Sequence, residues 1–330
     1  MRTVLAVWVA AAALVGCGAP ESGGRASGGA SGTSGMGGAA GAGAGGEGSG
    51  GAAGDDGGLA PAQVFATLSA PAGGLAFGED AAATPVLFVS VPSTDSVMRV
   101  SATGAVELLA TIPSPTGIAR TAAGRLLVCG QGPAGDQGVV YEVDPATGDA
   151  TPLVTDATTL AGKRLSAIAV APDDRVLFSD DGSTVYRADA DGRNLSIATA
   201  TVGKPTALAF SADGGTLYAA ASTDGSLWKI IRNRTLGNYT TPTRIASGLA
   251  GVAGMVVLES GELIVIGAEV TRLAGDGSSP TTLLGPAALT TPAGAAAGVG
   301  PFGATWLYAG EAGAVVRLSL PGTALTLPVR

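Results

Sequence analysis

The sequence predicts an all-β fold: a six-bladed β-propeller of four-stranded antiparallel blades that follows a disordered, glycine-rich N-terminal segment. Three observations predict it. From Val64 onward, short β-branched runs alternate with Gly, Asp, Pro and Ser turns, and no stretch keeps a helical period. A small-residue segment that leads into an apolar strand recurs at intervals of about 40 to 50 residues, the period of a propeller blade. Before this repeat, residues 17–58 lack the composition of a folded domain.

The first part of the chain, residues 1–16, is predicted to be a lipoprotein signal peptide. Arg2 precedes an apolar run over Val4–Val15, which is too short to span a bilayer and has the length of a signal-peptide core. The run ends in Leu14-Val15-Gly16-Cys17, which resembles the bacterial lipobox, so Cys17 is the predicted lipidation site. Its acyl chains, palmitate among them, would anchor the protein to a membrane. An ordinary cleaved signal peptide with an incidental cysteine is the alternative.

The second part, residues 17–58, joins the lipidated Cys17 to a linker made almost entirely of Gly, Ala and Ser. Such a segment has too few large apolar side chains to offset the entropy of ordering it, so we expect a flexible tether. Gly18 stands where an Asp is associated with retention in the inner membrane. The sequence therefore predicts a protein of the bacterial cell envelope, lipid-anchored at the outer membrane, in the periplasm or on the cell surface.

The third part, residues 59–330, is the predicted propeller domain. The whole chain has 330 residues and a formal net charge of −8, with no His and no run of basic residues. The absence of a basic stripe argues against nucleic-acid binding. The absence of His excludes Ser-His-Asp and Cys-His catalysis. We expect a monomer.

The repeat begins with six segments that should form the inner strands of the blades. Each has small residues followed by an apolar run: 71–77, 115–119, 165–170, 205–210, 252–257 and 292–297. A second strand follows each one: 86–90, 126–129, 176–179, 216–219, 263–266 and 306–309. A third, alternating strand comes next: 97–100, 139–143, 185–187, 227–230, 270–273 and 315–318.

The outer strands are weaker in the sequence, and the closure of the ring is left open by it. Outer strands are visible at 106–109, 244–245 and 281–284. Residues 64–68 and 324–329 both look like outer strands, and either would complete the last blade. Six copies of a unit that cannot bury its own face predict radial stacking into a ring. Seven blades are the alternative.

Two of these blades resemble a known family of propellers. The segments 172–187 and 210–218 are similar to blades of gluconolactonase-like and NHL-repeat propellers. The gluconolactonase resemblance implies a central divalent cation held by a Glu on the first inner strand, an Asn in a Pro-Asn-Gly turn and an Asp in a later Asp-Gly turn. The matching positions here read Gly73-Gly74, Pro205-Thr206-Ala207 and Ala253-Gly254, so no metal ligand and no cofactor is expected there.

Three further residues are considered for ligand binding or reactivity. Asp180 and Asp181, at the end of a strand and next to Gly182, are candidate ligands for Ca²⁺ or for a bound molecule, although an Asx turn is the favoured interpretation. Cys129 is the one cysteine besides Cys17, and we expect an inert core thiol. No catalytic residue is predicted.

The function predicted from these residues is binding rather than catalysis. A tethered propeller would present its loops and central mouth to a protein, a cell-envelope component or a small ligand. Thr116, Ser166, Thr206 and Ala253 should converge at that mouth. The alternative is a gluconolactonase-like or lyase-like enzyme acting on a lactone or sugar acid, and a purely structural surface protein is a third class.

Overall fold

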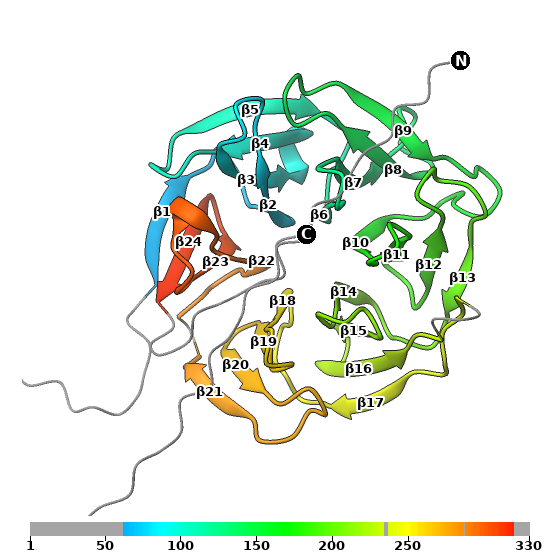
Figure 1. The fold of residues 1–330 in the computed structure, drawn as a ribbon, viewed down its shortest axis with the longest axis vertical. Coiled ribbons are helices and arrows are strands. Elements are labelled where there is room, and N and C mark those ends of the chain that lie inside the picture. The colour runs from blue at the N-terminus through cyan, green and yellow to red at the C-terminus, as the bar shows by residue number, and fades with distance from the viewer. Residues whose placement is uncertain (1–61, 234–236, 287, 320–330) are drawn as a thin grey trace, which may run out of the picture. The chain divides into compact units, whose positions relative to one another are not determined.

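The computed structural model describes residues 62–233, 237–286 and 288–319. In this part of the chain, six four-stranded antiparallel sheets surround a central axis (Figure 1). The prediction of a six-bladed propeller is confirmed, and the seven-bladed alternative is wrong. The predicted signal peptide (1–16), Cys17 and the linker (17–58) lie outside the described residues.

Each blade runs from an inner strand at the axis to an outer strand at the periphery (Figure 1). The inner strands are β2 (Leu75–Glu79), β6 (Ile118–Arg120), β10 (Leu165–Val170), β14 (Pro205–Phe210), β18 (Gly254–Val257) and β22 (Ala293–Ala297). The second strands are β3 (Pro85–Val91), β7 (Leu126–Gln131), β11 (Val176–Asp180), β15 (Thr216–Ala221), β19 (Leu263–Ile266) and β23 (Trp306–Glu311).

The outer half of each blade completes the sheet. The third strands are β4 (Ser96–Val100), β8 (Gly138–Val143), β12 (Val185–Ala188), β16 (Ser226–Ile231), β20 (Val270–Leu273) and β24 (Ala314–Ser319). The outer strands are β5 (Val106–Thr111), β9 (Ala150–Val154), β13 (Ser196–Thr199), β17 (Thr243–Ala246), β21 (Thr281–Leu284) and β1 (Gln63–Thr67). Blades 1 to 6 are named here by their inner strands, in the order β2, β6, β10, β14, β18 and β22.

The first strand of the described chain closes the ring. β1 pairs with β24, with Gln63 opposite Arg317 and Thr67 opposite Ala314, and so supplies the outer strand of blade 6. Of the two candidates for this place, residues 64–68 are therefore the closing strand to within one residue. The other candidate, residues 324–329, lies outside the described residues. Closure by the N-terminal strand ties the two ends of the fold into one sheet.

The hydrophobic core lies between the blades. Side chains of a strand alternate between its two faces, so a second strand that is sandwiched between blades is apolar on both. On β3, Leu87 and Val89 pack against blade 6, while Val86 and Phe88 pack against blade 2. Six such interblade clusters follow one another around the ring. This burial explains why the second strands read as unbroken apolar runs in the sequence.

Two short 3₁₀ helices occur in the loops, η1 (Pro92–Thr94) and η2 (Gly300–Phe302). Within the described residues, no helix has the length and the apolar character needed to cross a membrane.

Close approach of the inner strands depends on the smallest residues. A Cβ at Gly254 would lie 2.8 Å from the Ala295 Cβ, and a Cβ at Gly294 would lie 2.6 Å from the Gly73 carbonyl oxygen. Carbon atoms in contact prefer about 3.5–4.0 Å. Gly294 also has a φ of +50°, which disfavours any other residue. Blades 5, 6 and 1 therefore meet backbone to backbone at the axis.

Replacing Gly294 by Ala should lower the free energy of unfolding by about 2 kcal/mol, because the new Cβ meets the backbone of blade 1 in a conformation that alanine avoids. Chemical denaturation followed by tryptophan fluorescence measures the change. Gly285→Ala is the control, since nothing lies within 4 Å of a Cβ at that position. Equal stability of the two variants would contradict the importance of this contact.

Candidate functional site

The inner strands begin at a mouth lined by small and apolar residues. Thr116, Ser166, Thr206 and Ala253 all line this cavity of about 290 Å³, so their predicted convergence is confirmed. In all six blades the residue that follows this position at the mouth is Gly or Ala. The residue after that is larger and apolar in five of the six blades. These deeper residues are Leu75, Ile118, Ile168, Leu208, Met255 and Ala295. The mouth therefore narrows onto an apolar floor.

Hydroxyl groups at the mouth, and that of Ser90 beneath it, join neighbouring blades. The Ser90 hydroxyl donates to the Thr116 carbonyl in blade 2. Thr116 Oγ1 donates to the Leu165 carbonyl at 2.9 Å. The Ser166 hydroxyl donates to the Pro205 carbonyl at 2.6 Å. Thr206 Oγ1 donates to the Val252 carbonyl at 2.9 Å and so connects blade 4 to blade 5. Four consecutive junctions thus carry a bond from one blade to the next.

The donor chemistry of this mouth does not fit a divalent cation. Hard cations need several carboxylate, amide or carbonyl oxygens that converge on one point. Gly73, Thr206 and Ala253 line the mouth at the three positions that the resemblance assigns to ligands, and no lining residue is acidic. In the described part of the chain, no group of three or more His, Cys, Asp or Glu could hold a metal ion.

Asp180 lies outside the set of mouth-lining residues and is fully buried at the end of β11. Its Oδ1 accepts hydrogen bonds from the amides of Gly182 and Thr184, both at 3.1 Å. Its Oδ2 accepts one from the Tyr186 hydroxyl at 3.1 Å and lies 3.1 Å from Lys163 Nζ. The amide contacts are those of an Asx turn. A bound ligand or Ca²⁺ at Asp180 stays a prediction.

Asp181 and Cys129 differ in their exposure. Asp181 is exposed, and its amide donates to the Arg164 carbonyl at 2.8 Å. Its predicted role as a ligand is not tested by this arrangement. Cys129 is fully buried in the core between blades 2 and 3, and burial raises the pKa of its thiol. A thiol whose pKa is raised is a poor nucleophile at neutral pH.

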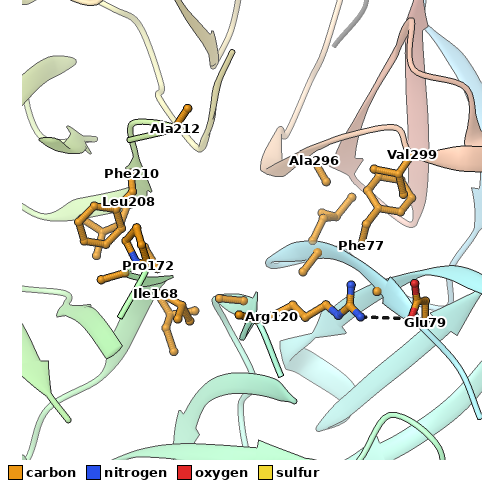
Figure 2. Close-up of a pocket in the computed structure, with 18 of the residues that line it drawn as sticks. Phe77, Glu79, Arg120, Ile168, Pro172, Leu208, Phe210, Ala212, Ala296 and Val299 are labelled. Atoms are coloured by element: carbon orange, nitrogen blue, oxygen red, sulfur yellow. Dashed lines mark hydrogen bonds and ion pairs between the residues drawn. The ribbon is translucent and has the colours of Figure 1, made fainter. Parts of the chain in front are cut away.

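A larger cavity, of about 490 Å³, opens at the other ends of the inner strands. Figure 2 shows Phe77 and Val299 on one side of it and Phe210 and Pro172 on the other. Blades 1, 2, 3, 4 and 6 contribute the residues that line it, and Leu75, Ile168 and Leu208 line both this cavity and the mouth. We call it the wide cavity. Its size is within the range typical of small-molecule sites.

The wall around Phe77 is fixed by the closure of the ring. The Phe77 ring makes edge contacts with Phe302, at 4.8 Å between centroids, and with Tyr308, at 5.4 Å. Phe65 of the closing strand packs on the same two rings. The Tyr308 hydroxyl donates to the Phe302 carbonyl at 2.8 Å, which holds η2 beside the cavity. Edge contacts between rings favour one arrangement, so the Phe77 wall is preorganised.

One pair of opposite charges faces the wide cavity. Arg120 ends β6, and its Nη2 lies 3.3 Å from Glu79 Oε2 at the end of β2 (Figure 2). Arg120 and Glu79 are the two charged residues that line the cavity. This pair was not predicted from the sequence. A signal was present, because the position of Arg120 in the repeat is apolar in the other blades: Phe77, Val170, Phe210, Val257 and Ala297.

Removing a junction hydroxyl should weaken the ring. Thr206→Val keeps the shape of the side chain but loses the bond to the Val252 carbonyl, so we expect a loss of about 1 kcal/mol in unfolding free energy. Chemical denaturation measures it. The exposed Thr155, whose hydroxyl makes no hydrogen bond in the described structure, supplies the control Thr155→Val. A loss no greater than the control's would show that the junction bond contributes nothing.

The Lys163–Asp180 pair predicts that the stability of the fold depends on pH in the alkaline range. The hydrogen bond to Asp180 raises the pKa of Lys163 above its usual 10.5. Stability from a raised pKa is fully present below the unfolded value and is lost as pH rises through the folded value. The Lys163 side chain is 39% exposed, so solvent screening reduces the contribution of the pair. Lys163→Gln should therefore cost no more than about 1 kcal/mol at pH 8, and this difference should shrink above pH 10.5. Denaturation of both proteins across pH tests this, and a constant difference would contradict it.

Comparison with known proteins places this architecture in a family. The family model described as "SMP-30/Gluconolactonase/LRE-like region" matches residues 79–296. No curated protein matches the chain. Several solved structures share its fold. A gluconolactonase from Xanthomonas campestris is 22% identical with a TM-score of 0.64, and the match covers 80% of this chain and 95% of that one.

Two further structures extend the comparison. The calcium-binding protein regucalcin from Agrobacterium tumefaciens is 18% identical with a TM-score of 0.64, over 79% of this chain and 93% of that one. An auxiliary nutrient binding protein from Bacteroides thetaiotaomicron is 12% identical with a TM-score of 0.61, over 78% and 76%. At these identities the structures establish the fold, while the family model covers most of the propeller. The chain belongs to the SMP-30/gluconolactonase/LRE-like family.

Proposed function

We propose that this chain is a lipid-anchored, extracytoplasmic member of the family that binds a small ligand in the wide cavity. One observation carries the proposal: apolar side chains from five blades line an open cavity of about 490 Å³ that also contains one pair of opposite charges, Arg120 and Glu79. A mostly apolar hollow with a few convergent polar groups is the usual form of a small-molecule site. The N-terminal lipobox and tether would hold this site at a membrane surface.

A second candidate function is hydrolysis of a lactone or a related reaction on a sugar acid. The family model supports it, because gluconolactonases are named in the family to which residues 79–296 belong. The residues at the mouth argue against a cation-dependent form of that reaction. The hydroxyls at the mouth donate to neighbouring blades, and no carboxylate lines it. We therefore favour binding over this alternative.

Blocking the wide cavity should abolish binding. Ala122 lines the cavity and is exposed, whereas its exposed neighbour Ala123 does not line it. We expect 1-naphthaleneacetate and its neutral analogue 1-naphthaleneacetamide, as fluorescent probes, to bind the full chain. Binding should weaken by about tenfold or more in Ala122→Trp and stay unchanged in the control Ala123→Trp, because only the first indole fills the cavity. Fluorescence titration measures both.

The outcomes separate the two functions. Failure of both probes to bind, or equal binding by both variants, would overturn the proposal. The same preparations are assayed for hydrolysis of gluconolactone with added Ca²⁺, Zn²⁺, Mg²⁺ or Mn²⁺ and with a chelator. We expect no rate above that of buffer. Hydrolysis that needs a cation would favour the enzymatic function. It would also show that the protein binds a cation through groups other than the side chains described at the mouth.

A further inference from the structure

We propose that the ligand of the wide cavity is a small carboxylate with an apolar body, and that Arg120 holds the carboxylate group. This inference rests on the proposed function, because it specifies the ligand of the same cavity.

The Arg120 guanidinium has unused donors. Its Nη2 lies 3.3 Å from Glu79 Oε2, which is longer than the roughly 2.7–2.9 Å of a well-formed charged hydrogen bond. Its Nε is buried and has no hydrogen-bond partner in the described part of the chain. A buried donor without an acceptor costs free energy, which a ligand oxygen placed there would recover. The guanidinium therefore offers a place for an acceptor that the protein does not fill.

The geometry of arginine favours a carboxylate as that acceptor. Nε–H and one Nη–H of a guanidinium point in parallel and match the two oxygens of a carboxylate. The aliphatic part of Arg120 passes Gly78, where a Cβ would lie 3.4 Å from the Arg120 Cδ. Figure 2 shows the side chain extended along one edge of the cavity with its guanidinium turned toward Glu79. Arg120 lines the cavity and its side chain is 23% exposed, so a ligand in the cavity lies beside this charged side chain.

The remaining walls select the body of the ligand. Phe77 and Phe210 line opposite sides of the cavity, and Ile168, Leu208 and Val299 add aliphatic surface (Figure 2). Apolar walls reward a ligand that loses apolar surface to them, and they offer little to a polyhydroxylated sugar. A ring or a short aliphatic chain attached to the carboxylate fits this surface.

Glu79 is the competitor of the ligand. Its side chain is 48% exposed, so it can turn into solvent when another anion takes its place on Arg120. Its negative charge nevertheless opposes a carboxylate at the same site, since like charges at short range repel. The two residues should therefore affect binding in opposite directions. A merely structural ion pair would not behave in this way, because loss of either partner would disturb the same contact.

The test compares 1-naphthaleneacetate with 1-naphthaleneacetamide on the full chain, using naphthalene fluorescence. The two probes share shape and differ in charge. We expect the acid to bind about tenfold more tightly than the amide. In Arg120→Gln the affinity for the acid should fall about tenfold while the affinity for the amide changes little. In Glu79→Gln the acid should bind several-fold more tightly.

A matched control is Arg99→Gln, which removes the arginine of the Arg99–Glu107 pair on strands β4 and β5, neither residue of which lines the cavity. It should leave both affinities unchanged, and thermal unfolding shows whether each variant is folded. Equal binding of acid and amide, with Ala122→Trp still blocking both, would overturn this inference and leave the proposed function intact. Failure of both probes in the wild type would overturn both. Weaker acid binding in Glu79→Gln would show that the pair acts structurally.

Discussion

The whole propeller depends on how closely its inner strands approach one another at the axis. A Cβ added at Gly74 or Gly117 would lie 2.6–2.8 Å from a carbonyl of the next blade, and Gly254 and Gly294 are equally confined. With these side chains absent, short hydroxyl groups at neighbouring positions can reach carbonyls across the junctions. The same closeness leaves the mouth narrow and its polar atoms occupied. The packing that builds the ring therefore also limits the chemistry at its mouth.

The two ends of the inner strands therefore differ in the size of the residues that line them. At the start of each strand, small residues serve the contact between blades, and the space that remains is about 290 Å³. At the other end the cavity is larger, about 490 Å³, and Phe77, Arg120 and Phe210 line it from equivalent positions of the repeat. The family frame is thus retained while the composition of the mouth differs from the cation-binding pattern that the sequence resemblance implies.

The sequence was sufficient for the blades because their burial follows from the period of a strand. Runs such as 176–179 and 263–266 are buried on both faces and coincide closely with β11 and β19. The outer strands β9 and β13 were not predicted, since both are short and carry residues that weaken an apolar strand pattern, Thr151 and Pro152 in β9 and Ser196 and Thr199 in β13. The Arg120–Glu79 pair also escaped, because 41 residues separate its members and only the ring brings their blades together. The convergence of Thr116, Ser166 and Thr206 was predictable, but their use in junction bonds required knowledge of the facing carbonyls.

The pairing of β1 with β24 has a mechanical consequence. Any tension applied to the chain ahead of residue 62 enters the domain through β1, so the backbone hydrogen bonds between Gln63–Thr67 and Ala314–Arg317 bear the load before any other part of the ring. Phe65 and the rings of Phe302 and Tyr308 resist the same displacement. Phe77 packs against those rings, so separation of β1 from β24 would loosen one wall of the wide cavity. Force on β1 would therefore act on this wall of the cavity through the rings of Phe65, Phe302 and Tyr308.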